Sequence, residues 1–230
     1  MRLIYLAVIL IVISVVNSTA QQKGKIIYEQ TINIHKSLSP DQQSLKSIIP
    51  ETITKNYELS FNSEKAHLKE IEQTSNIMFI PIGGGSSNNV FFDLKDNKVK
   101  SFFSVDEEYF YTESEIKPIT EASNGESRKI LGYDCKAFVQ DKMTFWVTKQ
   151  LPKYLSPLSP FHFNGAVLAI DSDRISYKAT KIEKEIDPEA FKTPEAQKVT
   201  KEQAEDLQEE AVNSMKQVKQ VKQVKQVIKK

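Results

Sequence analysis

The feature that most constrains the fold is an alternation of apolar and polar residues with a period of two, which recurs along most of the chain. Between residues 24 and 35, one face of such a run would hold Ile26, Tyr28, Ile32 and Ile34. Alternation over short runs is typical of strands that bury one face. The pattern therefore predicts further strands near residues 53–61, 90–94, 99–105, 109–111, 133–139, 143–147 and 175–179.

Residues that favour turns separate these runs, and they indicate how the strands are connected. Such residues tolerate the backbone angles of tight turns, and strands at intervals of about 8 to 14 residues favour an antiparallel meander. Strands do not alternate with helices, which argues against a doubly wound parallel sheet. We therefore predict a mainly β (α+β) domain with a curved antiparallel sheet or an open half-barrel meander. The turns are expected at Asn62-Ser63, Asp96-Asn97, Asn124-Gly125, Asp141-Lys142 and Asp171-Ser172-Asp173.

One apolar run, from Ala166 to Ile170, does not alternate. Pro157 and Pro160 precede it, and Gly165 lies directly before it. A continuous apolar run of this length is consistent with a strand that is buried on both faces. Glycine at its start would allow a close backbone approach. We interpret this stretch as the entry to a buried strand, in preference to a catalytic loop or a membrane contact.

A short amphipathic helix is predicted between the first two strands. Ser39 and Gln42 have the spacing of a capping box, and Leu45 and Ile48 begin an apolar stripe that Pro50 ends. We expect this helix to lie on the apolar side of the sheet.

A long helix is predicted at the C-terminus. Thr200 and Gln203 form a second capping-box pair. Leu207, Ala211 and Met215 follow at intervals of four, so they could dock on the body. A one-turn helix is also expected just after Asp187.

The last residues repeat Lys-Gln-Val. In an α-helix, each three-residue step turns about 300°, so the valines hold no single face. We therefore expect a solvated basic tail with at most a weak, salt-sensitive contact to an anionic membrane. The whole chain has a net charge of +1, so the part before the tail is net acidic. The lysines concerned are Lys216, Lys219, Lys222, Lys225, Lys229 and Lys230.

The first 20 residues have the pattern of a secretory signal. Arg2 precedes an apolar run from Leu3 to Val16, and Ser18 and Ala20 suit a cleavage site that would leave Gln21 first. An uncleaved anchor is the alternative, but a bilayer span needs about 20 apolar residues. We expect an exported protein of the periplasm or cell envelope, with a β domain over residues 21–199 and a helical tail over residues 200–230.

Residues with catalytic or metal-binding chemistry are sparse. His35, His67 and His162 fall on separate predicted elements, without a second ligand at metal spacing. Cys135 is the only cysteine, so it cannot form an internal disulfide, and its place in an alternating run predicts a buried, inert thiol. No catalytic residue, metal site or cofactor is predicted. Export and the scarcity of arginine argue against a nucleic-acid partner.

One apolar segment does not alternate and precedes three glycines. It would either cover the core as a lid or face a partner or ligand, since exposed apolar clusters mark contact sites. This candidate contact segment consists of Ile77, Met78, Phe79, Ile80 and Ile82.

Several short stretches, in order, resemble the GLPGLI family of exported Bacteroidetes proteins. They are KIIYEQ, NYELSFNSEKAHLKE, RKILGYDCKAF, MTFWVTKQLP and KVTKEQAEDL. The naming motif Gly-Leu-Pro-Gly-Leu-Ile corresponds here to residues 163–168, where Gly165 alone is kept. The resemblance thus implies a divergent member, and it supplies no catalytic residues.

Together these observations predict a non-enzymatic envelope accessory or binding protein. By analogy with lipoprotein-carrier half-barrels, its ligand would be apolar and held between the sheet and the short helix. One alternative is a periplasmic hydrolase or metal-dependent enzyme, whose polar residues would converge from separate strands. Another is a structural or adaptor protein that acts through its C-terminal helix.

Overall fold

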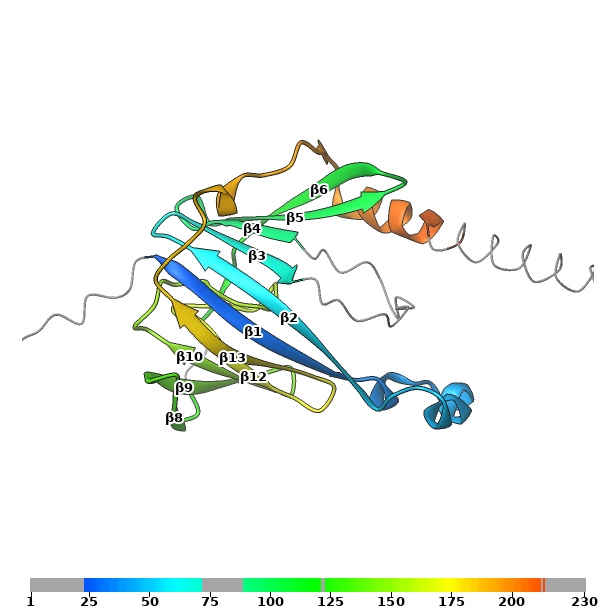
Figure 1. Cartoon of the computed structure of the whole chain (residues 1–230), viewed down its shortest axis with the longest axis horizontal. Helices are drawn as coiled ribbons and strands as arrows, with labels where there is room; N and C mark the ends of the chain where they lie inside the picture. Colours follow the sequence, from blue (N-terminus) through cyan, green and yellow to red (C-terminus); the bar gives the residue numbers. More distant parts are fainter. Residues whose placement is uncertain (1–22, 72–88, 121–122, 212, 214–230) are drawn as a thin grey trace, which may run out of the picture.

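The computed structural model describes residues 23–71, 89–120, 123–211 and 213, and strands dominate this part of the chain (Figure 1). The strands are β1 (Gly24–Asn33), β2 (Thr52–Phe61), β3 (Lys65–Ile71), β4 (Asn89–Asp93), β5 (Lys98–Val105), β6 (Glu108–Glu115), β7 (Pro118–Ile119), β8 (Ser127–Ile130), β9 (Tyr133–Gln140), β10 (Met143–Thr148), β11 (His162–Phe163), β12 (Ala166–Asp171), β13 (Ile175–Glu183) and β14 (Gln197–Lys198). The 3-10 helices are η1 (His35–Ser37), η2 (Pro40–Ser47) and η3 (Pro188–Phe191), and one α-helix covers residues 201–211.

Twelve of the strands form one sheet, in the order β14-β6-β5-β4-β3-β2-β1-β13-β12-β10-β9-β8. Two antiparallel meanders meet at β1, because this first strand pairs with β2 on one side and with β13 on the other. The edge strand β14 alone pairs in parallel within this sheet, with β6. The predicted mainly β fold with a large antiparallel sheet is confirmed.

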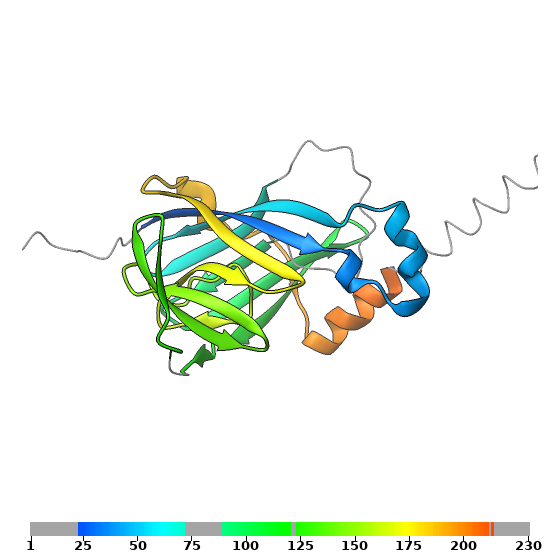
Figure 2. The ribbon, with the colours of Figure 1, turned by 90° about the horizontal axis from the view of Figure 1, so that it is seen from below.

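The sheet curls around residues 151–163, which we call the inner segment (Figure 2). His162 meets the ring of Phe92 edge-on at 5.6 Å between centroids, and Phe163 lies 5.1 Å from Phe145. Phe92 is on β4 and Phe145 is on β10, with β1 between these strands in the sheet order. Two consecutive residues thus bridge both halves, so side chains fill the space that the curved sheet surrounds.

The strand that follows the inner segment is buried on both faces, as its apolar run predicts. Each residue from Ala166 to Ile170 is at most 2% exposed. The Tyr28 hydroxyl donates a hydrogen bond of 2.6 Å to the Val167 carbonyl oxygen. A residue of the first strand is therefore tied directly to β12, two positions away in the sheet.

Three hairpins close through pairs of residues with positive φ, which is the backbone pattern of the two-residue turns that match strand twist. Asp141-Lys142 was expected as a turn and has φ values of 51° and 63°. Asp106-Glu107 and Leu131-Gly132 have the same pattern but were not expected from the sequence. Neither turn contains the Asn-Gly, Asp-Gly or Gly-Gly pair that usually signals such a hairpin, so the sequence does not reveal them.

The predicted position of the short helix is wrong. Ser39 and Gln42 do form the expected capping box, but η2 is a 3-10 helix without a buried residue. Ile48 directly follows it and is 75% exposed. The element lies beyond the ends of β1 and β2 (Figure 1). The physical reason is that the inner segment already occupies the apolar side of the sheet.

The chain returns across the sheet after β13 through residues 184–200, which we call the C-terminal strap. Asp187 caps η3 as expected, accepting a 2.9 Å hydrogen bond from the Glu189 amide. The Thr200–Gln203 capping box is also confirmed, with reciprocal bonds of 3.1 and 2.9 Å. A long C-terminal helix is not confirmed, because the described helix has 11 residues.

Both predicted terminal features lie outside the described residues, namely the signal at residues 1–20 and the Lys-Gln-Val repeat. Within the described ranges, none of the helices is long and apolar enough to cross a membrane.

The entry to β12 generates a first prediction. A Cβ added at Gly165 would lie 2.4 Å from the Thr148 carbonyl oxygen and 2.9 Å from Val147 Cγ1. Gly165→Ala must therefore displace backbone, and we expect it to lower the free energy of unfolding by about 3 kcal/mol. Urea unfolding followed by fluorescence measures this loss.

Gly125→Ala is the matched control. Its added Cβ would meet open space, so only the positive φ of 92° opposes the change, at a cost of about 1 kcal/mol. Equal losses for the two variants would contradict the close approach at Gly165.

Candidate functional site

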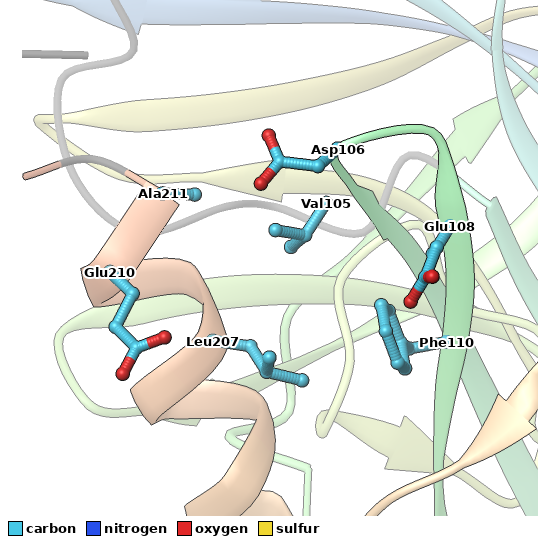
Figure 3. Close-up of a pocket in the computed structure, with 7 residues that line it drawn as sticks. All are labelled: Val105, Asp106, Glu108, Phe110, Leu207, Glu210 and Ala211. Atoms are coloured by element: carbon cyan, nitrogen blue, oxygen red, sulfur yellow. The ribbon is translucent and has the colours of Figure 1, made fainter. Parts of the chain in front are cut away.

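A groove lies between the β5–β6 hairpin and the C-terminal helix, and we call it the hairpin groove (Figure 3). Its volume is about 310 Å³. Phe110 from the hairpin and Leu207 from the helix point toward each other across it. The full lining is Val105, Asp106, Glu108, Phe110, Leu207, Glu210 and Ala211.

A small apolar cluster seats the helix against the hairpin. Phe110, Val199 and Ala204 are buried together, and Leu207 packs against them. The Phe110 ring also stacks on Phe103, with 5.6 Å between centroids. Leu207 and Ala211 thus face the hairpin, as their spacing of four residues predicts. Met215, the third member of that line, lies outside the described residues.

Three carboxylates surround the apolar part of this groove. Asp106 comes from the hairpin turn, Glu108 from the start of β6, and Glu210 from the helix on the opposite side. Among the residues that the structure describes, no group of three or more His, Cys, Asp or Glu side chains could hold a metal ion. Apolar walls with carboxylates around them suit a ligand that presents both aliphatic and cationic groups.

The hairpin turn holds Asp106 in an unusual backbone conformation. Asp106 and Glu107 have φ values of 49° and 69°. This left-handed region costs most L-residues about 1 kcal/mol each, and glycine or asparagine would relieve that cost. Of these two residues, Asp106 lines the groove, so the turn conformation fixes where its carboxylate stands.

A second arrangement of polar side chains lies near the core, and we call it the polar cluster. The Tyr57 hydroxyl donates to Gln30 Oε1 at 3.3 Å, and Gln30 Nε2 donates to the Tyr177 hydroxyl. The Lys55 ammonium lies 3.0 Å from the Glu70 carboxylate, which faces Tyr57 in the strand pairing. Burial raises the pKa of Tyr177 to about 12, so this phenol stays protonated.

The polar cluster draws its members from β1, β2, β3 and β13. The sequence did not predict the polar cluster, because the register between neighbouring strands decides which polar side chains come into contact. Each of the five side chains has a partner in the cluster. This mutual pairing is what a buried polar network needs in order to be stable.

The three histidines remain apart. His35 Nε2 lies 3.1 Å from the Ile49 carbonyl oxygen. His67 contacts the Ala190 carbonyl at 2.6 Å and the Asn89 side chain, and it stacks on the Phe91 ring. It thereby fixes the C-terminal strap to β3 and β4.

His162 is the most deeply buried of the three, at 2% exposure. Its Nδ1 lies 3.1 Å from the Tyr154 carbonyl oxygen and donates to it, while Nε2 has no hydrogen-bond partner among the described residues. Burial lowers the pKa of this imidazole. Its surroundings therefore favour a neutral ring in the core.

Two further sequence expectations concern contact and reactivity. The candidate contact segment, Ile77 to Ile82, lies outside the described residues. Cys135 is buried at 1% exposure, as predicted. Burial raises the pKa of its thiol to about 11, so little thiolate is present at neutral pH.

Comparison with known proteins supports the fold alone. No family model and no curated protein matches the chain. Among solved structures, 15 chains match. One is PNGF-II, with a TM-score of 0.55 and 19% sequence identity over 83% of this chain. The match covers 34% of the PNGF-II chain, so this protein spans about a third of that length.

The burial of Cys135 generates a second prediction. The thiol of the native mature protein should react with an aromatic disulfide reagent at least about a hundredfold more slowly than the urea-unfolded thiol, because burial limits both access and ionisation. Absorbance of the released thiolate measures both rates. Equal rates would show that Cys135 is reachable in the folded state.

The neutral His162 generates a third prediction. Because its folded pKa lies below its usual value of about 6.5, the unfolded chain binds the extra proton more readily. The stabilisation is complete above that usual value and falls as the pH drops below it. The urea midpoint should therefore decrease between about pH 7.5 and pH 5.

His162→Asn is the diagnostic variant for this pH effect. Asparagine can place an amide donor near the Nδ1 position but cannot gain a proton. We expect the variant to lose less stability over the same pH interval, although His67 still contributes because burial lowers its pKa too. An unchanged pH slope would show that His162 does not cause the decrease.

Proposed function

We propose that this chain is an exported, non-enzymatic accessory protein that binds a basic segment of an envelope partner in the hairpin groove. The single observation that carries the proposal is the joining of apolar walls and three carboxylates in one groove. The signal-like residues 1–20 and the resemblance to the GLPGLI family support export. As a divergent member of that family, the chain would share its location without inheriting a catalytic site.

The filled interior is the reason for placing the contact on the outside. Side chains of the inner segment pack between β4 and β10, and η2 contains no buried residue. An apolar ligand between the sheet and this short helix would therefore have no enclosing wall on the helix side. The hairpin groove, in contrast, combines an apolar lining with charge.

The likeness to PNGF-II is consistent with a modular role. A similar arrangement of strands makes up part of a longer chain there, so the fold also occurs joined to further sequence. At 19% identity, the likeness carries no activity to this chain.

An enzyme is a second candidate, because polar residues of the polar cluster do converge from four strands. Lys55 and Glu70 remain about one-fifth exposed, so a small substrate could reach them. Their ion pair would have to open before either could move a proton. Because breaking the Lys55–Glu70 ion pair costs free energy, we regard an enzymatic function as the less favoured candidate.

Titration of the full mature chain with a labelled peptide tests the groove, which is our fourth prediction. The probe is a 12-residue peptide of lysine, glutamine and valine in random order, and its control has glutamate for lysine. We expect an apparent dissociation constant of about 1 mM at low salt, weakening at least about threefold at 0.5 M salt as the charges are screened. Fluorescence anisotropy measures the binding.

The variant Asp106→Asn, Glu108→Gln, Glu210→Gln should lose this binding. The variant Glu64→Gln, Glu126→Gln, Glu185→Gln removes as many negative charges from exposed positions away from the groove, so it should bind like the unaltered chain. Equal weakening in both variants would mean that the peptide senses only overall charge, and the proposed contact surface would be wrong.

A further inference from the structure

The Lys-Gln-Val repeat has a geometric property that complements the hairpin groove. Its period of three fits neither an α-helix nor a flat strand. In a polyproline II or 3-10 conformation there are three residues per turn. The valines would then line one edge, the lysines a second edge and the glutamines a third. The aligned valines are Val218, Val221, Val224 and Val227.

The two surfaces match in chemistry. In a polyproline II conformation the valine edge would repeat about every 9 Å, and one such side chain suits the apolar wall formed by Val105 and Leu207. The lysine edge lies beside the valine edge, where Asp106, Glu108 and Glu210 stand around the groove. Valine thus meets the apolar wall, and lysine meets the carboxylates.

The connection between them is short enough for one chain to supply both. Ala211 lines the groove itself, and Val218 follows seven residues later. That length of chain can extend about 23 Å, so it can turn back toward the hairpin. A short tether also gives the repeat a millimolar effective concentration at its own groove, which favours it over the tail of another copy.

In place of the solvated tail that an α-helical repeat predicts, we propose that the repeat of residues 216–227 docks at the hairpin groove of its own chain, with the valine edge on Val105 and Leu207 and the lysine edge at the three carboxylates. The proposal rests on the groove being a contact surface. It adds a regulatory consequence: the tail competes with a basic partner, so a partner must displace it.

Tryptic cleavage of the full mature chain tests the docking directly and is our fifth prediction. Mass spectrometry gives the cleavage rates after Lys216 and Lys219 at low salt. We expect cleavage about threefold slower than in the variant Asp106→Asn, Glu108→Gln, Glu210→Gln, which corresponds to a groove occupied about two-thirds of the time. At 0.5 M salt the two rates should converge, because exposed ion pairs are screened.

A composition-matched variant tests the period itself. The changes Val221→Gln, Gln223→Val, Val224→Gln and Gln226→Val keep every charge but move two valines off the shared edge. This variant keeps its lysines, so it should be cleaved faster than the unaltered chain but more slowly than the groove variant. The variant Glu64→Gln, Glu126→Gln, Glu185→Gln should keep the slow cleavage of the unaltered chain.

Each other outcome overturns the inference. Equal rates in all variants would mean that the tail does not dock. Slow cleavage that persists in the groove variant would place the tail elsewhere, and protection that grows with protein concentration would assign it to a second copy. The peptide titration can still succeed in each of these cases, so failure of the tail proposal is distinguishable from failure of the groove as a binding surface.

Discussion

The packing of the inner segment between the two halves of the sheet is the interaction on which the rest of the structure depends. Phe163 is 1% exposed and touches both Phe138 and Phe145, while the neighbouring His162 reaches Phe92 on the far side. Fully burying a side chain such as Phe contributes about 1.5–3 kcal/mol. Gly165 then lets the chain pass close to Thr148 and enter β12. Without this segment, the space between the two meanders would be left unfilled.

Filling the interior moves the available binding surfaces to the outside of the molecule. The C-terminal strap crosses β3 and β4, where His67 contacts the Ala190 carbonyl, and β14 then pairs with β6. This path delivers the C-terminal helix to the hairpin, where Phe110 and Leu207 face each other. The hairpin groove therefore forms because the C-terminal strap places the helix of residues 201–211 beside the β5–β6 hairpin.

The sequence predicts the strands well because a period of two is a local signal. It misses β3, where Glu70 interrupts the apolar face of Ala66 and Leu68, and β8, since Ser127, Arg128 and Lys129 carry no apolar alternation. It misplaces the short helix because an apolar stripe does not reveal that the side it would cover is already full. The hairpin groove and the polar cluster were also missed. Both depend on which strands become neighbours, and register is a property of the whole sheet.

The two edge strands of the sheet determine whether a partner could bind by adding a strand of its own. Exposed strand edges invite pairing with another chain unless they are short, charged or covered. At one edge β8 has four residues, and Arg128 is held by the Asp171 carboxylate at 3.1 Å and by the face of Trp146. At the other edge, β14 adds two residues beside β6. With one edge short and charged and the other partly covered, strand addition is disfavoured. Recognition by side chains, as we propose for the hairpin groove, is then the more accessible route to a partner.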